Sequence, residues 1–411
     1  MSTVGVIAEY NPYHNGHKYL IDQAMQRTNA DKVIALMSGS FLQRGNPAMA
    51  DKYSRAEAAV IAGVDAVFEL PVIYATGSSR DFATGAVALL SALNSVDYIA
   101  FGVEDEDINT INKVSEILVA EPDDYKKYLN NYLARGLSYP SASEKAIVKI
   151  LGKDVEEMMS KPNNILGISY LSAMKKLNSK LIPILIKRND QGYFSTDLNG
   201  SHSSATAIRN AISMKTDISK YVPKKTTKAY SIYFDKDLPE SSWLTPYINS
   251  RIIYDRNLDP KISQLDKVMD MNPELLNRLR KAPLPSKYVE LADFLKTKNL
   301  TMTRVSRVLL HMVLGIIDSD RNFPKDNGYS DYSEYINLLA FKKTNSQFIK
   351  EITEKSDLKV INKKSEFVPE TAYGERMWQL DKLATDLYNQ LVYENINIRL
   401  HSELTSTVRV V

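Results

Sequence analysis

The chain has 411 residues, contains no cysteine and carries a formal net charge of +3 at pH 7. This length is enough for two or three hydrophobic cores, and the lack of cysteine excludes disulfides, thiolate metal sites and cysteine nucleophiles. The first apolar run, Val4–Ala8, is far too short to cross a bilayer, and no basic leader precedes it. We therefore expect a cytoplasmic protein that binds neither membrane nor DNA.

The first half alternates short apolar runs with helical patterns, which is the rhythm of a parallel sheet with crossover helices. Strands are predicted at Val4–Ala8, Val33–Met37, Ala66–Leu70, Tyr98–Phe101 and Leu181–Ile186. The helices predicted between them are His17–Thr28, Ser54–Ala62, Asp81–Leu93 and Ile165–Leu177, and a helical insertion is predicted at about 107–160. The pattern indicates an α/β, Rossmann-like domain over residues 1–220.

The second half shows longer helical periods, at Arg304–Ile317 and Met377–Asn395, and a polar loop at Asp320–Tyr335. We expect a separate, mainly α-helical domain over residues 221–411. The small excess of basic residues lies in this half. Such a weak charge excess suits a domain that grips a few RNA phosphates, but many helical domains that bind no nucleic acid carry as much.

The first predicted strand runs directly into the segment Glu9–His17, which opens the first helix. Ligands bind at this edge of open parallel sheets, and a helix N-terminus there favours phosphate. Gly16 lets a triphosphate approach the backbone, and His14 and His17 can each donate a ring N–H to the leaving pyrophosphate. Helix capping by the two histidines is the simpler alternative. A zinc site is disfavoured, because neither a His-Glu-x-x-His helix nor a cysteine accompanies them.

A second candidate segment, Ser203–Arg209, opens a helix after the fifth predicted strand. The hydroxyls of Ser204 and Thr206 can simply cap that helix. Because the segment follows the last strand, its N-terminus can also face the same sheet edge, where Arg209 would pair with phosphate oxygens. Together with the two histidines, it predicts a two-sided cradle for a polyphosphate.

The His-x-Gly-His turn and the Ser-x-Thr-x-Ile-Arg segment resemble the nucleotidyltransferase superfamily related to class I aminoacyl-tRNA synthetases. Three runs, Val6–His17, Met37–Ala48 and Lys161–Gly167, more closely resemble the bacterial tRNA(Met) cytidine acetate ligase family. The resemblance covers the N-terminal half in order, whereas the C-terminal half matches only in general helical character. It implies a HUP-type nucleotidyltransferase domain with a helical insertion, and a mainly α-helical C-terminal domain that binds tRNA.

The activity that this resemblance implies is an ATP-dependent acetate ligase with two steps. Acetate attacks ATP to give acetyl-adenylate and pyrophosphate, and N4 of the wobble cytidine of elongator tRNA(Met) then takes the acetyl group. ATP is the nucleotide substrate, and Mg²⁺ is expected to accompany it. Two alternatives stay open: transfer of an adenylyl or cytidylyl group to a phosphorylated metabolite, and a nucleotide-sensing RNA-binding module without turnover.

Carried over by position, the resemblance implies catalysis by His14, His17 and Arg209. It places the nucleotide on Gly102, on Asn163 or Asn164, on Arg188, and on the first turn, which comprises Ile7, Ala8, Glu9, Tyr10, Asn11, Pro12, Tyr13, His14, Asn15, Gly16, His17, Lys18, Tyr19 and Leu20. Ser204 and Thr206 complete the set. Gly102 can instead be a plain turn, one asparagine can serve as a cap, and Lys187 can face the site in place of Arg188.

Two further groups of polar residues are candidates for contact with substrate. Gln43 and Arg44 follow the second predicted strand and are candidates for contacting the acyl-adenylate or the incoming base; solvated loop side chains are the alternative. Arg304, Arg307 and His311 share one face of a predicted helix, which suits RNA phosphate as well as an ordinary charged outer face.

Overall fold

The computed structural model describes residues 1–105, 107–188, 203–258, 263–321 and 329–411. Within these ranges eight strands form one sheet in the order β5-β4-β1-β2-β3-β6-β7, and β8 pairs with β6. The strands predicted in the first half are confirmed as β1 (Thr3–Ala8), β2 (Lys32–Ser38), β3 (Ala66–Leu70), β4 (Tyr98–Val103) and β5 (Ile182–Lys187). Their continuous apolar runs are typical of parallel strands covered on both faces.

The order of the parallel strands places β1 at the point where the chain reverses direction across the sheet. From β1 the chain proceeds to β2 and β3 on one side, and then returns to β4 and β5 on the other. β1 pairs in parallel with both β2 and β4. Such a switch point leaves a crevice at the carboxyl ends of the strands, where ligands bind in folds of this class.

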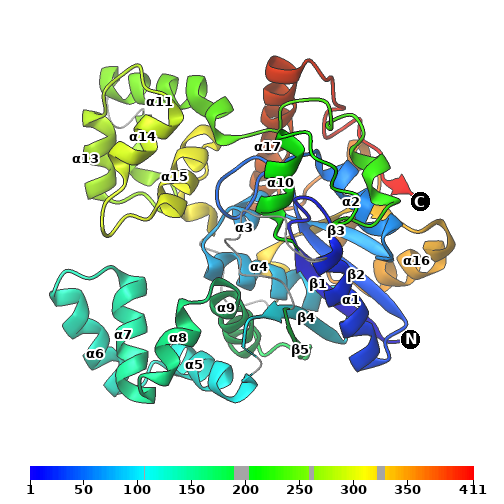
Figure 1. Ribbon diagram of the computed structural model, residues 1–411, viewed down its shortest axis with the longest axis horizontal. Helices are drawn as coiled ribbons and strands as arrows, with labels where there is room; N and C mark the ends of the chain where they lie inside the picture. Colours follow the sequence, from blue (N-terminus) through cyan, green and yellow to red (C-terminus); the bar gives the residue numbers. More distant parts are fainter. Residues whose placement is uncertain (106, 189–202, 259–262, 322–328) are drawn as a thin grey trace.

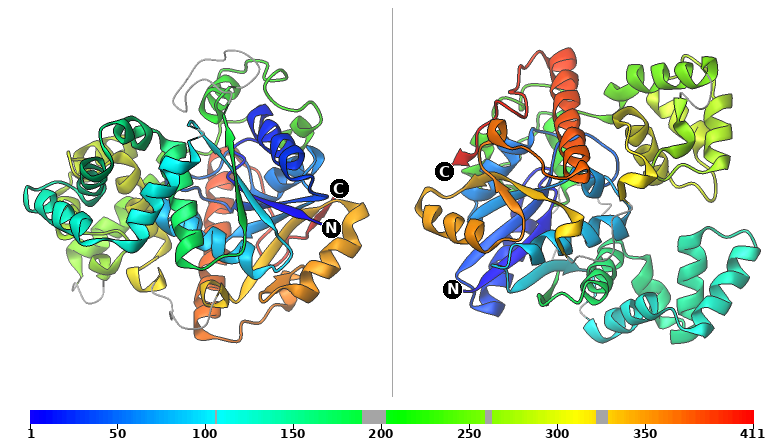
Figure 2. Two further views of the ribbon diagram at one scale, coloured as in Figure 1. Left: turned by 90° about the horizontal axis from the view of Figure 1, so that it is seen from below. Right: turned by 180° about the vertical axis from the view of Figure 1, so that it is seen from behind.

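Helices cover both faces of the sheet (Figure 1, Figure 2). On one face lie α1 (Asn15–Thr28) and α2 (Lys52–Ile61), and on the other α4 (Ser79–Ala92) packs against α9 (Pro162–Lys176). N-cap side chains fix where two of these helices begin. Asp51 accepts hydrogen bonds from the first turn of α2, and Ser78 forms a capping box with Asp81 in α4. No helix within the described residues has the length and apolarity needed to span a membrane.

Two helical lobes project from the same side of the sheet in Figure 1. The first lies between β4 and β5, at the position expected for a helical insertion, and comprises α5 (Ile108–Ala120), α6 (Asp123–Ala134), α7 (Tyr139–Leu151) and α8 (Asp154–Ser160). The second comprises α11 (Thr245–Asn257), α13 (Pro273–Lys281), α14 (Tyr288–Leu295) and α15 (Met302–Leu314). The lobes touch where Asn299 Nδ2 donates to the carbonyl of Gly136, at 3.3 Å.

The remaining elements are short or belong to the C-terminal part. The helices are α3 (Val72–Ala75), α10 (Ala205–Ser213), α16 (Ser346–Lys355) and α17 (Ala372–Ile396). The 3-10 turns are η1 (Thr226–Tyr230), η2 (Ser241–Leu244), η3 (Leu265–Lys267), η4 (Asp318–Arg321), η5 (Tyr329–Tyr332), η6 (Lys343–Asn345) and η7 (Lys364–Glu366). The predicted loop Asp320–Tyr335 lies partly outside the described residues, and its described ends include η4 and η5.

The second half is mainly helical, as expected, but it does not form a separate body. β6 (Tyr335–Phe341) pairs antiparallel with β3, and both β7 (Lys359–Ile361) and β8 (Arg409–Val410) pair with β6. The boundary expected at residue 220 is therefore wrong for residues 335–411. The reason is that β6 covers the edge of β3, which would otherwise expose unpaired backbone groups.

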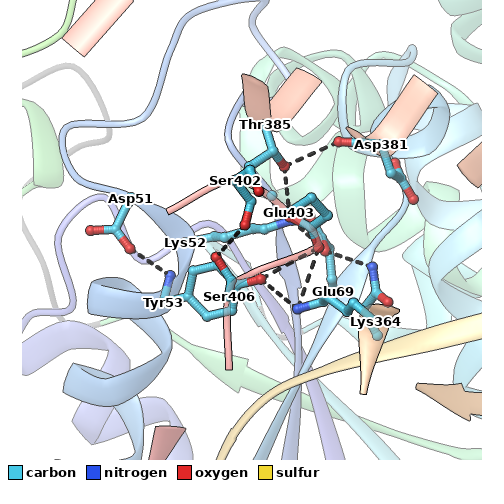
Figure 3. Close-up of polar contacts among 12 residues, drawn as sticks. Asp51, Lys52, Tyr53, Glu69, Lys364, Asp381, Thr385, Ser402, Glu403 and Ser406 are labelled. Atoms are coloured by element: carbon cyan, nitrogen blue, oxygen red, sulfur yellow. Dashed lines mark hydrogen bonds and ion pairs between the residues drawn. The ribbon is translucent and has the colours of Figure 1, made fainter. Parts of the chain in front are cut away.

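A buried cluster of charged side chains also ties the end of the chain to the first half (Figure 3). Lys52 Nζ lies 2.7 Å from Glu69 Oε1 and 2.7 Å from Glu403 Oε2. Lys364 Nζ lies 3.3 Å from Glu403 Oε1, and Thr385 donates to Glu403 Oε2 at 2.9 Å. All four charged residues are buried, so removal of any one leaves the buried cluster with an unbalanced charge. Residues 335–411 are thus part of the same core as the first-half sheet.

Candidate active site

The N-terminus of α1 is closed by two histidines that cap it reciprocally. Gly16 donates its backbone N–H to Nδ1 of His14 at 3.1 Å, and His14 donates its own backbone N–H to Nδ1 of His17 at 3.2 Å. The two ring centroids are 3.8 Å apart. The capping role and the phosphate-binding role are therefore compatible, because capping uses only one nitrogen of each ring.

These hydrogen bonds define which ring nitrogen carries the proton. Nδ1 must be unprotonated to accept a hydrogen bond, so each neutral ring carries its proton on Nε2. Burial lowers the pKa of His17, and the charges of His14 and Arg188 lower it further. At neutral pH the His17 ring is therefore neutral and offers Nε2–H as a donor.

Arg209 lies beside this histidine turn, although nearly 200 residues separate the two segments. Its Nη1 donates to the carbonyl oxygen of Asn11 at 2.7 Å, and its Nη2 donates to Thr206 Oγ1 at 3.2 Å. Ser204 caps α10 by accepting from the backbone N–H of Ala207 at 3.1 Å. The two predicted halves of the polyphosphate cradle therefore meet at one edge of the sheet.

The residues predicted near β4 and β5 converge on the other side of β1. Arg188 Nη1 donates to Asn163 Oδ1 at 3.1 Å, and Asn163 Nδ2 donates to Glu104 Oε1 at 2.6 Å. A Cβ atom on Gly102 would lie 3.1 Å from Cγ of Arg188, so this glycine leaves room for the arginine side chain. Lys187, the alternative to Arg188, is exposed.

The geometry also distinguishes the two asparagines. Asn164 is fully buried, and its Oδ1 accepts from the backbone N–H groups of Glu104 and Asp105 at 2.9 and 3.2 Å. Its Nδ2 donates to Asp105 Oδ2 at 2.9 Å and to the carbonyl of Met158 at 3.1 Å. Asn164 holds the turn after β4, whereas Asn163 contacts the Arg188 side chain.

Gln43 and Arg44 lie in the loop 38–47 after β2, and both are half-buried rather than fully solvated. The backbone N–H of Gln43 donates to Glu9 Oε1 at 2.9 Å. Gly45 adopts a φ of +79°, and a Cβ atom there would lie 2.7 Å from the backbone of Ser306. The loop is therefore held between the end of β1 and the first turns of α15.

Arg55 is a structural part of the site that the sequence pattern did not reveal. It is fully buried, and its guanidinium donates to the carbonyls of Glu9 at 2.6 Å, Ser38 at 3.1 Å and Ala50 at 3.0 Å, and to that of Gly39. It thereby fixes the turns after β1 and β2 relative to each other. Its only sequence signal is a lone cation on the alanine-rich side of a predicted helix.

The predicted RNA-facing row of α15 is largely an internal contact. His311 is fully buried, and its Nε2 lies 3.0 Å from Thr76 Oγ1. Arg304 donates to the carbonyl of Asp270 at 2.9 Å, and Arg307 forms an ion pair with the Asp270 carboxylate at 3.2 Å. The prediction of RNA contact is wrong for His311, because α15 is buried on nearly all sides, and both arginines already bind Asp270.

Comparison with known proteins gives the family. A family model described as HIGH Nucleotidyl Transferase matches residues 1–403. A tRNA(Met) cytidine acetate ligase of Thermoanaerobacter sp. (strain X514) is 38% identical over 402 residues, covering 97% of each chain. This chain belongs to the tRNA(Met) cytidine acetate ligase family. A ligase of the same name from Acetivibrio thermocellus is 34% identical and covers 96% of each chain.

Solved structures of the ligase family agree over the whole length. Apo TmcAL of Thermotoga maritima superposes with a TM-score of 0.90 at 28% identity, covering 100% of both chains. TmcAL of the same organism bound with alpha-thio ATP gives a TM-score of 0.88 at 27% identity, covering 100% of this chain and 99% of the other. The likeness to the ligase family therefore extends through the C-terminal half, beyond the motifs of the N-terminal half.

Proposed function

We propose that this chain is an ATP-dependent ligase that acetylates N4 of the wobble cytidine in elongator tRNA(Met). Acetate and ATP form acetyl-adenylate with release of pyrophosphate, and the acetyl group then passes to the cytidine amine to give N4-acetylcytidine. Family membership over the full chain supports the activity. An ATP analogue bound by a structural relative supports ATP as the nucleotide.

The observation that carries this proposal is the reciprocal capping of His14 and His17 at 3.1 and 3.2 Å, which places the ring proton of each histidine on Nε2. An acetate oxygen attacks the α-phosphorus of ATP, and pyrophosphate leaves with the bonding electron pair. Negative charge grows on the bridging oxygen during this step. Preorganised N–H donors at a helix N-terminus stabilise that charge, and Arg209, held at Asn11, adds a fixed positive charge.

The remaining nucleotide contacts fall on the residues that surround this turn. We place ATP along Ile7–Leu20, apart from the Glu9 carboxylate, whose charge would repel the triphosphate. Gly102, Asn163 and Arg188 would contact it on the β4 side, and Ser204 and Thr206 at α10. Among the described residues no group of three or more acidic, histidine or cysteine side chains could hold a metal ion. Mg²⁺ would therefore enter with the triphosphate and be held chiefly by its oxygens.

The tRNA would lie on the helical part of residues 221–411, and we place the anticodon near the loop 38–47. That loop contacts both Glu9 of the sheet edge and α15 of the second lobe. It therefore links the adenylate site to the lobe that carries part of the basic excess. A tRNA substrate and a chain without cysteine both fit the cytoplasm.

The experiment that tests this function is mass spectrometry of tRNA nucleosides from cells that lack the protein. Loss of N4-acetylcytidine from elongator tRNA(Met), restored by the wild-type gene, is the expected result. An unaltered nucleoside profile would instead favour adenylyl or cytidylyl transfer to a phosphorylated metabolite. ATP binding without any turnover in the purified protein would favour a sensing module.

A further inference from the structure

Glu9 occupies the central position of the sheet edge. It is the first residue after β1, the strand that lies between β4 and β2 at the switch point. Its backbone and its side chain are both held in place. Arg55 donates to its carbonyl oxygen at 2.6 Å, and the backbone N–H of Gln43 donates to its Oε1 at 2.9 Å. The side chain is only partly buried, so solvent or a ligand can reach this oriented carboxylate.

One oxygen of this carboxylate stays available. Within the described part of the chain, no hydrogen bond reaches Oε2 of Glu9, whereas Oε1 is bound by Gln43. Burial raises the pKa of the Tyr170 hydroxyl, and the charge of Glu9 raises it further. The Glu9 charge therefore acts on the β4 and α9 side of the sheet edge, where Tyr170 packs against Phe101, as well as on Arg55 in α2.

An anionic side chain at this point requires an explanation. ATP carries several negative charges, so a carboxylate beside it repels the nucleotide rather than binding it. The groups that suit phosphate, His14, His17, Arg188 and Arg209, are already present at the same edge of the sheet. A carboxylate is instead an acceptor for N–H groups and for protons.

We propose that Glu9 acts in the second step, as the base that takes the proton from the cytidine amine while that amine attacks acetyl-adenylate. This assignment rests on the proposed function. The nitrogen lone pair forms the new C–N bond to the acetyl carbon, and the bond between that carbon and the phosphate oxygen breaks. AMP leaves with the electron pair, and one N–H proton passes to Oε2 of Glu9 and from there to solvent.

A base is needed at this step because the amine is a weak nucleophile. The lone pair of an aromatic exocyclic amine is delocalised into the ring, so the nitrogen gains reactivity only as its proton is removed. General-base catalysis typically contributes about 10²- to 10⁴-fold to such a step. Gln43, which orients Glu9, lies in the loop 38–47, the same loop near which we place the incoming base.

The test separates the two half-reactions in the Glu9→Gln variant. Acetate-dependent exchange of pyrophosphate into ATP is expected to stay within about 3-fold of the wild type, because this step needs no base. Transfer of acetyl to tRNA is expected to fall by about 10²-fold or more. Hydroxylamine, a stronger nucleophile, is expected to trap acetyl-adenylate equally well in both proteins.

The outcomes are distinct. Equal losses in exchange and transfer would make Glu9 a nucleotide-site residue, and unchanged transfer would exclude it as the base; either result overturns the proposal. Recovery of part of the transfer in Glu9→Asp, which keeps a carboxylate, supports it. Glu116→Gln, at an exposed carboxylate on α5, is the control. No acetate-dependent exchange in the wild type would overturn the proposed function itself, independently of Glu9.

Discussion

Nδ1 of His17 accepts the backbone N–H of His14 at 3.2 Å, while Nδ1 of His14 accepts the backbone N–H of Gly16 at 3.1 Å. This reciprocal pair fixes both rings and their tautomers in one step. Under the proposed function, the same arrangement would present Nε2–H of both rings to the departing pyrophosphate. The backbone N–H groups at the start of α1 therefore set the orientation of both imidazole rings.

Replacement of His17 by alanine tests the donor role. Loss of one preorganised donor is expected to slow acetate-dependent pyrophosphate exchange by about 10²- to 10³-fold. The measurement is incorporation of labelled pyrophosphate into ATP at saturating acetate. His401→Ala, which changes an exposed histidine near the C-terminus, serves as the control. Exchange at the wild-type rate in His17→Ala would remove the histidine from the mechanism.

The two neighbouring asparagines are expected to respond differently to alanine. Asn163→Ala removes the partner of Arg188 and is expected to weaken ATP binding by about 5- to 10-fold, the value of one hydrogen bond. Asn164→Ala leaves the buried N–H groups of Glu104 and Asp105 without acceptors and is expected to cost about 2 kcal/mol of unfolding free energy. Isothermal titration and urea unfolding give the two values. Weaker ATP binding in Asn164→Ala together with lower stability in Asn163→Ala would contradict the proposal that Asn163 is the nucleotide-site residue.

Arg55→Met is expected to destabilise the fold and the site together. Several buried carbonyls, among them those of Glu9 and Ser38, lose their donor, and each unsatisfied group costs about 1–3 kcal/mol. We expect a loss of at least about 3 kcal/mol in urea unfolding. Arg80→Met, at an exposed arginine, is the matched control. A decrease of less than about 1 kcal/mol in the free energy of unfolding would mean that water satisfies the carbonyls that lose the guanidinium.

His311 makes stability depend on pH. Burial lowers its pKa to about 4 in the folded chain, against about 6.5 when unfolded. The stabilisation is therefore complete above pH 6.5 and is lost as pH falls toward 4, because only the unfolded chain binds the proton in that window. The loss is on the order of 3 kcal/mol. Urea unfolding at pH 7 and at pH 4 gives the free energy of unfolding of the wild type and of His311→Gln. The difference between the two proteins should be smaller at pH 4 than at pH 7 by that amount. A constant difference would contradict the buried placement.

The C-terminal segment is expected to be essential for the stability of the first-half core. Glu403→Gln removes a charge that Lys52 and Lys364 both contact, and breaking a buried ion pair typically costs about 3–5 kcal/mol. Urea unfolding monitored by circular dichroism measures the change. Glu366→Gln is the control, because Glu366 is exposed and forms a surface ion pair with Lys363. Equal stability of the two variants would contradict the structural role of the cluster.

The sheet and the nucleotide turn could be predicted because their signals are local. The buried parallel strands appear as short apolar runs, and His14 and His17 stand at the junction between β1 and α1. Arg209 could be placed at the same edge because it follows the last parallel strand, and its contact with Asn11 shows that the two segments meet. The topology of a parallel sheet brings such distant segments together without any long-range signal in the sequence.

The sequence-based predictions fail where a residue's environment depends on contacts with residues far along the chain. The sequence pattern places Tyr335–Phe341 in the helical half, because nothing local shows that this segment pairs with β3. His311 shares a helical face with two arginines, yet Thr76 covers it. Arg55 looks like a surface residue of an alanine-rich helix, but the carbonyls that it binds lie at the ends of two strands. In each case tertiary contacts override the local pattern.

In the proposed mechanism, acetate attacks the α-phosphorus of ATP at the histidine turn. The most direct measurement uses acetate labelled with ¹⁸O in both oxygens, together with ATP, tRNA(Met) and the wild-type protein. Transfer through acetyl-adenylate leaves one acetate oxygen on the phosphate, so AMP carrying one ¹⁸O atom is the predicted product. Unlabelled AMP, or label found in inorganic phosphate, would contradict this account.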